Sequence, residues 1–174
     1  MRWAAPGYIP AMQTPRERPT VRVLLFDPDH RLLLMKGRLT YAADAPSWWF
    51  TVGGGMEPGE TPEAAACREV AEETGFLDIR LGPVVWRREG IGHLSSGEQV
   101  LFKEHYLVAH CAGGEPLRDG WEAHEVDLVD DLRWWHLTEI RSSDERIFPQ
   151  GLADLLPVII DGQYPDQPLT LAWT

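Results

Sequence analysis

Three glutamates in one short segment have the residue type and spacing to neutralise a divalent cation. Glu69, Glu72 and Glu73 lie in a stretch of good helix formers, and their separations of three and four residues place them on one face of a helix. Carboxylates that repel one another add little stability unless a cation lies among them. Mg²⁺ and Mn²⁺ take oxygen ligands of this kind and complete their shell with water and substrate phosphates.

The residues around the glutamates predict where this helix begins and ends. Thr61 is a good N-cap and Pro62 suits the first helical position, whereas Gly75 is a typical C-terminal stop. Arg68 lies four residues before Glu72, a spacing that predicts an ion pair. A glycine-rich turn directly precedes the helix, so we expect a close approach of the backbone to a bound group.

A zinc or thiolate site is not expected. Cys67 and Cys111 are the only cysteines and form no CxxC pair. His105 and His110 are the closest histidine pair, and a gap of five residues in an extended strand places them on opposite faces.

The segment from Gly54 to Phe76 resembles the Nudix box, Gly-x5-Glu-x7-Arg-Glu-U-x-Glu-Glu-x-Gly-U, where U is a bulky apolar residue. It covers 23 of the 174 residues. A motif this long and constrained is far more specific than a lone glycine-rich pattern. The residues that match its defined positions are Gly54, Glu60, Arg68, Glu69, Val70, Glu72, Glu73, Gly75 and Phe76.

The resemblance implies a role for several of the side chains that match the motif. It implies that Glu69, Glu72 and Glu73 are metal ligands and act in catalysis. It implies that Gly54, with Gly55 beside it, forms the turn that brings the backbone close to substrate.

The resemblance also implies that Glu60 and Arg68 pair and hold the loop and the helix together. An ordinary amphipathic helix with a solvated acidic face is the alternative for this charge run. That alternative predicts neither the preceding glycines nor the full spacing.

Length, composition and charge favour one small enzyme domain over residues 1–174. A hydrophobic fraction of 44% argues against disorder, and no apolar run approaches the ~20 residues of a membrane helix. Two distant cysteines and no signal-peptide pattern make a reducing cytoplasm the expected location. The net charge of −11 disfavours a nucleic-acid polymer as partner. A small phosphorylated substrate and a homodimer are both compatible with these features.

Strands before and after one central helix predict an α+β or α/β layered domain. The resemblance sharpens this to the Nudix fold, a mixed β-sheet sandwiched between α-helices. Residues 1–19, with four prolines, are expected to form an irregular arm, and residues 149–160 a closing helix. The expected strands are residues 20–26, 31–36, 48–52, 77–92, 99–110 and 132–137.

Adjacent tryptophans occur twice, at Trp48-Trp49 and Trp134-Trp135. Neighbours in a strand point to opposite faces, so we expect one of each pair in the core and the other available to line a pocket. Core packing is the more common role of any single tryptophan, and the sequence assigns none to base stacking.

Glu104 is the candidate catalytic carboxylate outside the box. It lies in a strand-like apolar run, where a charge faces either water or a site. A solvated Glu104 is the alternative, and Glu122 and Glu125 are competing candidates. The resemblance does not decide among them, because Nudix enzymes differ in the position of the base.

Together these features predict a metal-dependent pyrophosphohydrolase that cleaves a nucleoside diphosphate linked to another moiety by water attack at phosphorus. A non-catalytic module that binds nucleotide or protein is the alternative, and the complete set of box carboxylates counts against it. An isoprenoid diphosphate isomerase would need its own cysteine, and Cys67 is expected to pack. The sequence does not rank the candidate phosphate contacts, which are Arg22, Lys36, Arg38, Arg87, Arg88 and Lys103.

Overall fold

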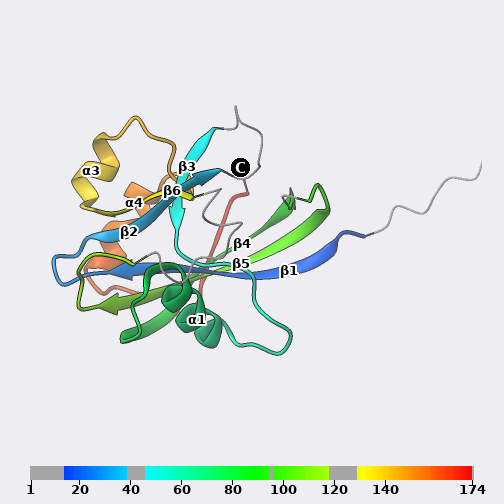
Figure 1. Ribbon diagram of the computed structural model, residues 1–174, viewed down its shortest axis with the longest axis horizontal. Helices are drawn as coiled ribbons and strands as arrows, with labels where there is room; N and C mark the ends of the chain where they lie inside the picture. The colour runs from blue at the N-terminus through cyan, green and yellow to red at the C-terminus, as the bar shows by residue number, and fades with distance from the viewer. Residues whose placement is uncertain (1–13, 39–45, 95, 118–128, 174) are drawn as a thin grey trace, which may run out of the picture.

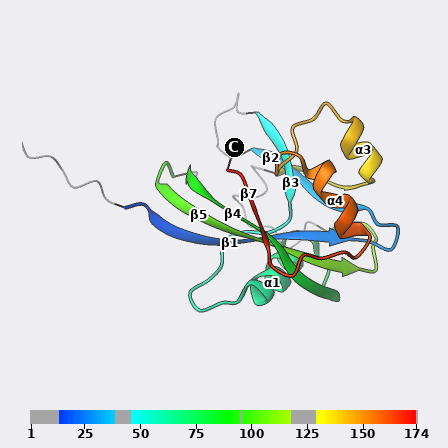
Figure 2. The same cartoon turned by 180° about the vertical axis from the view of Figure 1, so that it is seen from behind.

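Seven strands form one mixed sheet with helices on both faces (Figures 1 and 2). The computed structural model describes residues 14–38, 46–94, 96–117 and 129–173. The strands are β1 (Arg16–Phe26), β2 (Leu32–Arg38), β3 (Ser47–Thr51), β4 (Ile79–His93), β5 (Gln99–Cys111), β6 (Val129–Trp135) and β7 (Leu169–Leu171). The helices are α1 (Pro62–Thr74), α3 (Leu137–Ser142) and α4 (Leu152–Ile160).

Strand β1 lies at the centre of the sheet and determines what surrounds the box. The order is β3-β2-β1-β5-β4-β7, with β6 paired to β2. β1 runs parallel to β5 along its whole length, but meets β2 only where Phe26 faces Leu32. On the β2 side, the rest of the β1 edge pairs with residues 52–55, through bridges from Val23 to Val52 and from Thr20 to Gly55. The glycine turn therefore lies in the plane of the sheet.

The two faces of β1 build two separate cores, because successive side chains of a strand point to opposite sides. Val21, Val23 and Leu25 pack with α1 on one face. Leu24 and Phe26 pack on the other face with α3 and α4. Arg22 has the same alternation as Leu24, so it emerges on the face opposite α1.

Helix α1 begins and ends where the sequence predicts. The Thr61 hydroxyl accepts a hydrogen bond from the amide of Ala64 at 3.2 Å, and Pro62 is the first helical residue. Gly75 ends the helix in the left-handed conformation, with φ 74°. Ala66 and Val70 are fully buried against the sheet, which fixes the helix rotation and hence the direction of its glutamates.

Several expectations about elements need correction. The arm is too long by at least four residues, because Arg16 to Pro19 extend β1 along β5; residues 1–13 lie outside the described ranges. The closing helix starts later, at Leu152, with Gly151 as its N-cap. The expected strand 132–137 is placed too late, because β6 spans Val129–Trp135 and Leu137 already begins α3. Helix α3 and the short strand β7 were not predicted, since six and three residues are too few for a clear periodic pattern.

The described helices are all too short or too polar to cross a membrane.

Candidate active site

Arg68 is the centre of an ion-pair network that joins the glycine turn to α1. Its guanidinium donates to both carboxylate oxygens of Glu60, at 3.0 and 2.9 Å, and to the carbonyl of Gly55 at 3.0 Å. The remaining nitrogen, Nη1, contacts Glu69 at 2.8 Å and Glu72 at 3.1 Å. The predicted pairing of Arg68 with Glu60 and with Glu72 is therefore present in the structure. A planar guanidinium can bridge this many acceptors because its donors form a rigid fork.

Two of the three glutamates expected to bind metal lie in the interior. Glu69 and Glu73 are each 7% exposed, whereas the Glu72 side chain is 51% exposed. The Glu73 carboxylate accepts a hydrogen bond from the amide of Gly53 at 2.7 Å. Burial raises the pKa of Glu69, and the Arg68 charge offsets only part of this effect. The orientation of α1, with Ala66 and Val70 against the sheet, directs the Glu69 and Glu73 carboxylates toward the glycine turn.

The glycines of the turn are required by close contacts. Gly53 has φ 129°, and a Cβ there would lie 2.3 Å from the carbonyl oxygen of Val21. A Cβ on Gly54 would lie 2.6 Å from a carboxylate oxygen of Glu69. The expected role of Gly54 was to let the backbone approach substrate. What the structure shows is that Gly54 makes room for the Glu69 carboxylate.

The chemistry of these residues fits a hard divalent cation. Glu69, Glu72 and Glu73 offer only carboxylate oxygens, and Glu69 and Glu72 already share one cationic partner, Nη1 of Arg68. Within the described ranges, no three acidic, histidine or cysteine side chains are already gathered around one point. The assignment of the three glutamates as ligands stays a prediction.

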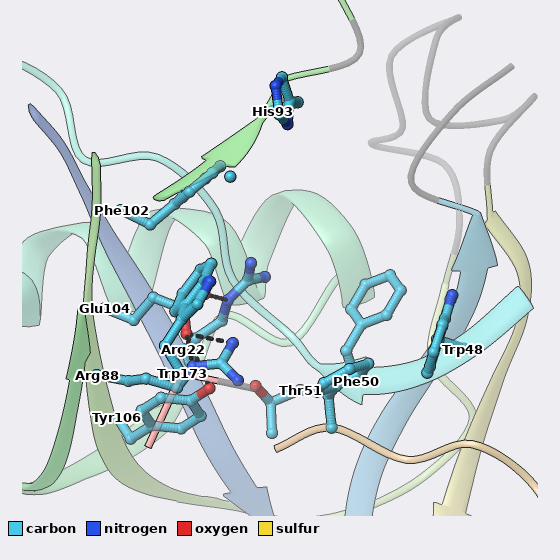
Figure 3. A pocket seen from close by; sticks show the side chains of 12 residues that line it. Arg22, Trp48, Phe50, Thr51, Arg88, His93, Phe102, Glu104, Tyr106 and Trp173 are labelled. Carbon is cyan, nitrogen blue, oxygen red and sulfur yellow. Dashed lines mark hydrogen bonds and ion pairs between the residues drawn. The ribbon is translucent and has the colours of Figure 1, made fainter. Parts of the chain in front are cut away.

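Glu104 is buried in a second network on the opposite face of the sheet. It is 2% exposed, so the solvated alternative is wrong. One oxygen accepts from Arg22 at 3.2 Å, and the other from Arg88 at 2.8 Å and from the Tyr106 hydroxyl at 3.0 Å (Figure 3). Burial alone would raise the pKa of Glu104, but the charges of Arg22 and Arg88 outweigh it and the pKa is lowered. Glu104 is thus held ionised between two cations.

The Glu104 network forms one wall of a pocket of about 300 Å³. Aromatic side chains from distant parts of the chain complete the lining; they are Trp48, Phe50, Phe102, Phe148 and Trp173 (Figure 3). A lining that combines charged groups with aromatic rings, such as Arg88 beside the Trp173 ring, is suited to a ligand that is part anion and part planar ring.

The backbone of Gly53 connects this pocket to the box carboxylates. Its amide donates to Glu73, and its carbonyl oxygen accepts from Arg22 at 3.1 Å. Arg22 also interacts electrostatically with Glu69 and Glu73. The acidic and the aromatic halves of the site are therefore contiguous through the backbone of one residue, Gly53.

The structure separates the candidate phosphate contacts. Arg22 and Arg88 line the pocket, whereas Arg87 does not. The other three form ion pairs elsewhere, namely Lys36 with Glu145, Arg38 with Asp130 and Lys103 with Glu17.

Arg18 and Trp173 were missed by sequence reasoning. Arg18 was placed in the irregular arm, but in β1 its guanidinium lies 3.0 Å from the point where a Cβ of Gly55 would be and interacts electrostatically with Glu69. Had the first strand been predicted to begin at residue 16, Arg18 would have been expected on the same face as Arg22, because the two residues are four apart in one strand. Trp173 is discussed below.

The remaining expectations have mixed outcomes. Trp49 and Trp135 are buried while Trp48 lines the pocket, which confirms one core residue in each pair. Cys67 is exposed, so the expectation that it packs is wrong. Glu122 and Glu125 lie outside the described residues.

Comparisons with known proteins identify a family model, sequence relatives and a shared fold. The family model described as NUDIX domain matches residues 16–156. An RNA pyrophosphohydrolase of Caulobacter vibrioides is 46% identical over 139 residues, which are 72% of this chain and 75% of that protein. The NAD-capped RNA hydrolase NudC of Deinococcus radiodurans is 42% identical over 146 residues, 81% of this chain but 47% of that protein. The crystal structure of an ADP-ribose pyrophosphatase from Streptococcus suis superposes with a TM-score of 0.55 at 15% identity, covering 90% of this chain and 98% of that one, and shows a shared fold.

Proposed function

The chain belongs to the Nudix hydrolase family and is a Nudix-type pyrophosphohydrolase, and from that premise we propose that it cleaves the diphosphate linkage of a nucleoside diphosphate joined to a second moiety. Cleavage depends on Mg²⁺ or Mn²⁺ held by Glu69, Glu72 and Glu73. Water attacks phosphorus, and the products are two phosphorylated fragments.

The backbone of Gly53 is the observation that carries this proposal. It contacts Glu73 on one side and Arg22 on the other, at 2.7 and 3.1 Å. A diphosphate that lies beside this residue reaches the box carboxylates with one end and the aromatic pocket with the other. A substrate with a phosphate chain and a planar base has the same division of chemistry.

The bound cation would neutralise phosphate charge and lower the pKa of the attacking water. Arg18 and Arg22 are positioned to stabilise the charge of the transferring phosphoryl group, since both interact electrostatically with Glu69. A box glutamate accepts the proton from water. The four hydrogen bonds and ion contacts to Glu104 favour a positioning role for it, in which it holds Arg22 and Arg88 in place.

The relatives suggest that the second moiety can be RNA. The Caulobacter protein is named as an RNA pyrophosphohydrolase, and the Deinococcus protein as an NAD-capped RNA hydrolase. The net charge of −11 weakens binding to a long polyanion, so we expect small nucleotides to be the better substrates.

A screen of diphosphates tests the proposal. Purified protein is incubated with nucleotide sugars, dinucleotides, ADP-ribose, nucleoside triphosphates and a 5′-triphosphate RNA, with Mg²⁺, Mn²⁺ or EDTA, and products are separated by ion-exchange chromatography. At least one compound is hydrolysed only with metal present. Complete inactivity across the panel would favour the non-catalytic alternative.

Glu73→Gln tests the metal site itself. Glutamine keeps an acceptor for the Gly53 amide but removes a charge, so turnover falls by at least 100-fold, while the unfolding temperature without metal holds or rises. Cys67→Ser, an exposed change on the same helix, is the matched control and leaves turnover unchanged. A Glu73→Gln protein with wild-type turnover and metal affinity would refute the site.

A further inference from the structure

Trp173 is brought into the pocket by the C-terminal strand. β7 runs parallel to β4, with Trp86 opposite Leu169 and Arg88 opposite Leu171. Two residues after β7, the Trp173 ring stacks with Phe102 at 5.8 Å between centroids and an interplanar angle of 18°. The Arg88 guanidinium lies 4.5 Å from the centre of the same ring. The last described residue thus completes a pocket that the rest of the sheet leaves open.

Two glycines of β4 form the seat for this ring. A Cβ on Gly90 would lie 2.0 Å from the Trp173 indole, and one on Gly92 would lie 2.9 Å from Phe102 and 3.4 Å from Trp173. Glycine is unfavourable in a strand interior and marks a place where another group approaches the backbone closely. Gly90 and Gly92 alternate with the same period as Arg88, so all three lie on the pocket face.

Trp173 is seated but not covered. It is 36% exposed and lines the pocket beside Arg88, as Figure 3 shows. Trp48, the competing indole, has its ring against Phe148 at 4.8 Å and the Arg146 guanidinium at 4.7 Å. Both indoles therefore contact one aromatic ring and one guanidinium. Trp173 differs in its greater exposure and in its partner, Arg88, which also binds Glu104.

We infer that Trp173 is a specificity-determining residue that stacks on the heterocyclic base of the substrate. The inference rests on the proposed function for the identity of the phosphate chain, which lies between Arg22 and the box glutamates. Every nucleobase has a π-face, so a stacking platform of this kind selects nucleotides over other diphosphates without choosing among bases. Arg88, fixed by Glu104, would adjoin both the stacked ring and the phosphate chain.

Metal-free binding of product-like probes tests the inference without relying on hydrolysis. Calorimetric titrations compare the four nucleoside 5′-monophosphates with ribose 5-phosphate, which has the same phosphate but no base. The wild-type protein binds at least one nucleotide roughly tenfold more tightly than ribose 5-phosphate. Trp173→Ala removes that preference, and Trp173→Phe retains part of it. Gly90→Ala also removes it, because the new methyl group displaces the indole while the tryptophan is still present.

Leu169→Ala is the matched control, since Leu169 is half exposed on the same strand and does not line the pocket. It leaves the preference within twofold of wild type. The inference is overturned if wild-type protein shows no preference for the base or if the preference survives Trp173→Ala. It is also overturned if Trp48→Ala removes the preference instead. Tighter binding by Trp173→Ala would overturn it as well, because it would mean that the indole blocks the pocket. Loss of base preference in Trp173→Ala without hydrolysis of any diphosphate would sustain the inference and refute the proposed function.

Discussion

Gly54→Ala is expected to damage the site through one contact. The added methyl group would lie 2.6 Å from one carboxylate oxygen of Glu69 and 2.7 Å from the other, whereas ordinary contact begins at 3.4 Å. The carboxylate or the turn must therefore move by about 0.8 Å. The carboxylate is tied to Arg68 at 2.8 Å, and the turn is tied to β1 by the bond from the Val21 amide to the Gly54 carbonyl at 3.0 Å.

Either movement disturbs a hydrogen bond and therefore costs free energy. Overpacking of this kind costs about 1–3 kcal/mol in the free energy of unfolding. A displacement of this size next to the reacting atoms lowers kcat/KM by roughly 100-fold. The assay measures kcat and KM on the best substrate of the screen, the Mn²⁺ dependence of rate, and urea unfolding without metal. We expect kcat/KM to fall by more than the increase in the unfolded fraction accounts for. We also expect the Mn²⁺ concentration for half-maximal rate to rise.

Gly59→Ala is the control in the same loop. Gly59 has φ 83° and nothing lies within 4 Å of its Cβ position, so alanine there introduces backbone strain without touching Glu69. It costs about 1–2 kcal/mol of stability and leaves kcat within a factor of three. Wild-type kcat/KM and metal dependence in Gly54→Ala, or an equal loss in both variants, would refute the steric role of Gly54.

Two further predictions concern the ion pairs. Arg68→Ala leaves Glu60 and Glu69 without their shared cation, so kcat/KM falls roughly 100-fold as the carboxylates shift and the unfolding temperature drops; Arg68→Lys does not restore activity, because an ammonium lacks the planar fork. Glu104→Gln leaves Arg22 and Arg88 uncompensated and lowers the free energy of unfolding by about 3–5 kcal/mol at pH 7. Since the folded-state pKa of Glu104 lies below its ordinary value of 4.5, the difference between wild type and Glu104→Gln is full above pH 4.5 and shrinks as the pH falls through the lower value. Urea unfolding of both proteins from pH 7 to pH 3 measures this difference, and a difference that grows toward acid would contradict the ion pairs.

The sequence by itself determined the parts of the site that are local. The spacing of Arg68, Glu69, Glu72 and Glu73 fixes their relation on α1, because helix geometry depends on position along one segment only. Thr61 and Gly75 likewise set the ends of that helix through contacts a few residues away.

Only the tertiary structure decided which residues from other parts of the chain complete the site. Arg22 and Glu104 are 82 residues apart in the chain, and they meet because the β1–β5 register places Arg22 beside Tyr106 and Thr20 beside Glu104. That register is set by burial of the two apolar faces of β1, which no local pattern around Glu104 reveals. Trp173 reaches the pocket for the same kind of reason: a three-residue strand carries it to Gly90, and such a pairing depends on the long-range sheet rather than on its own sequence.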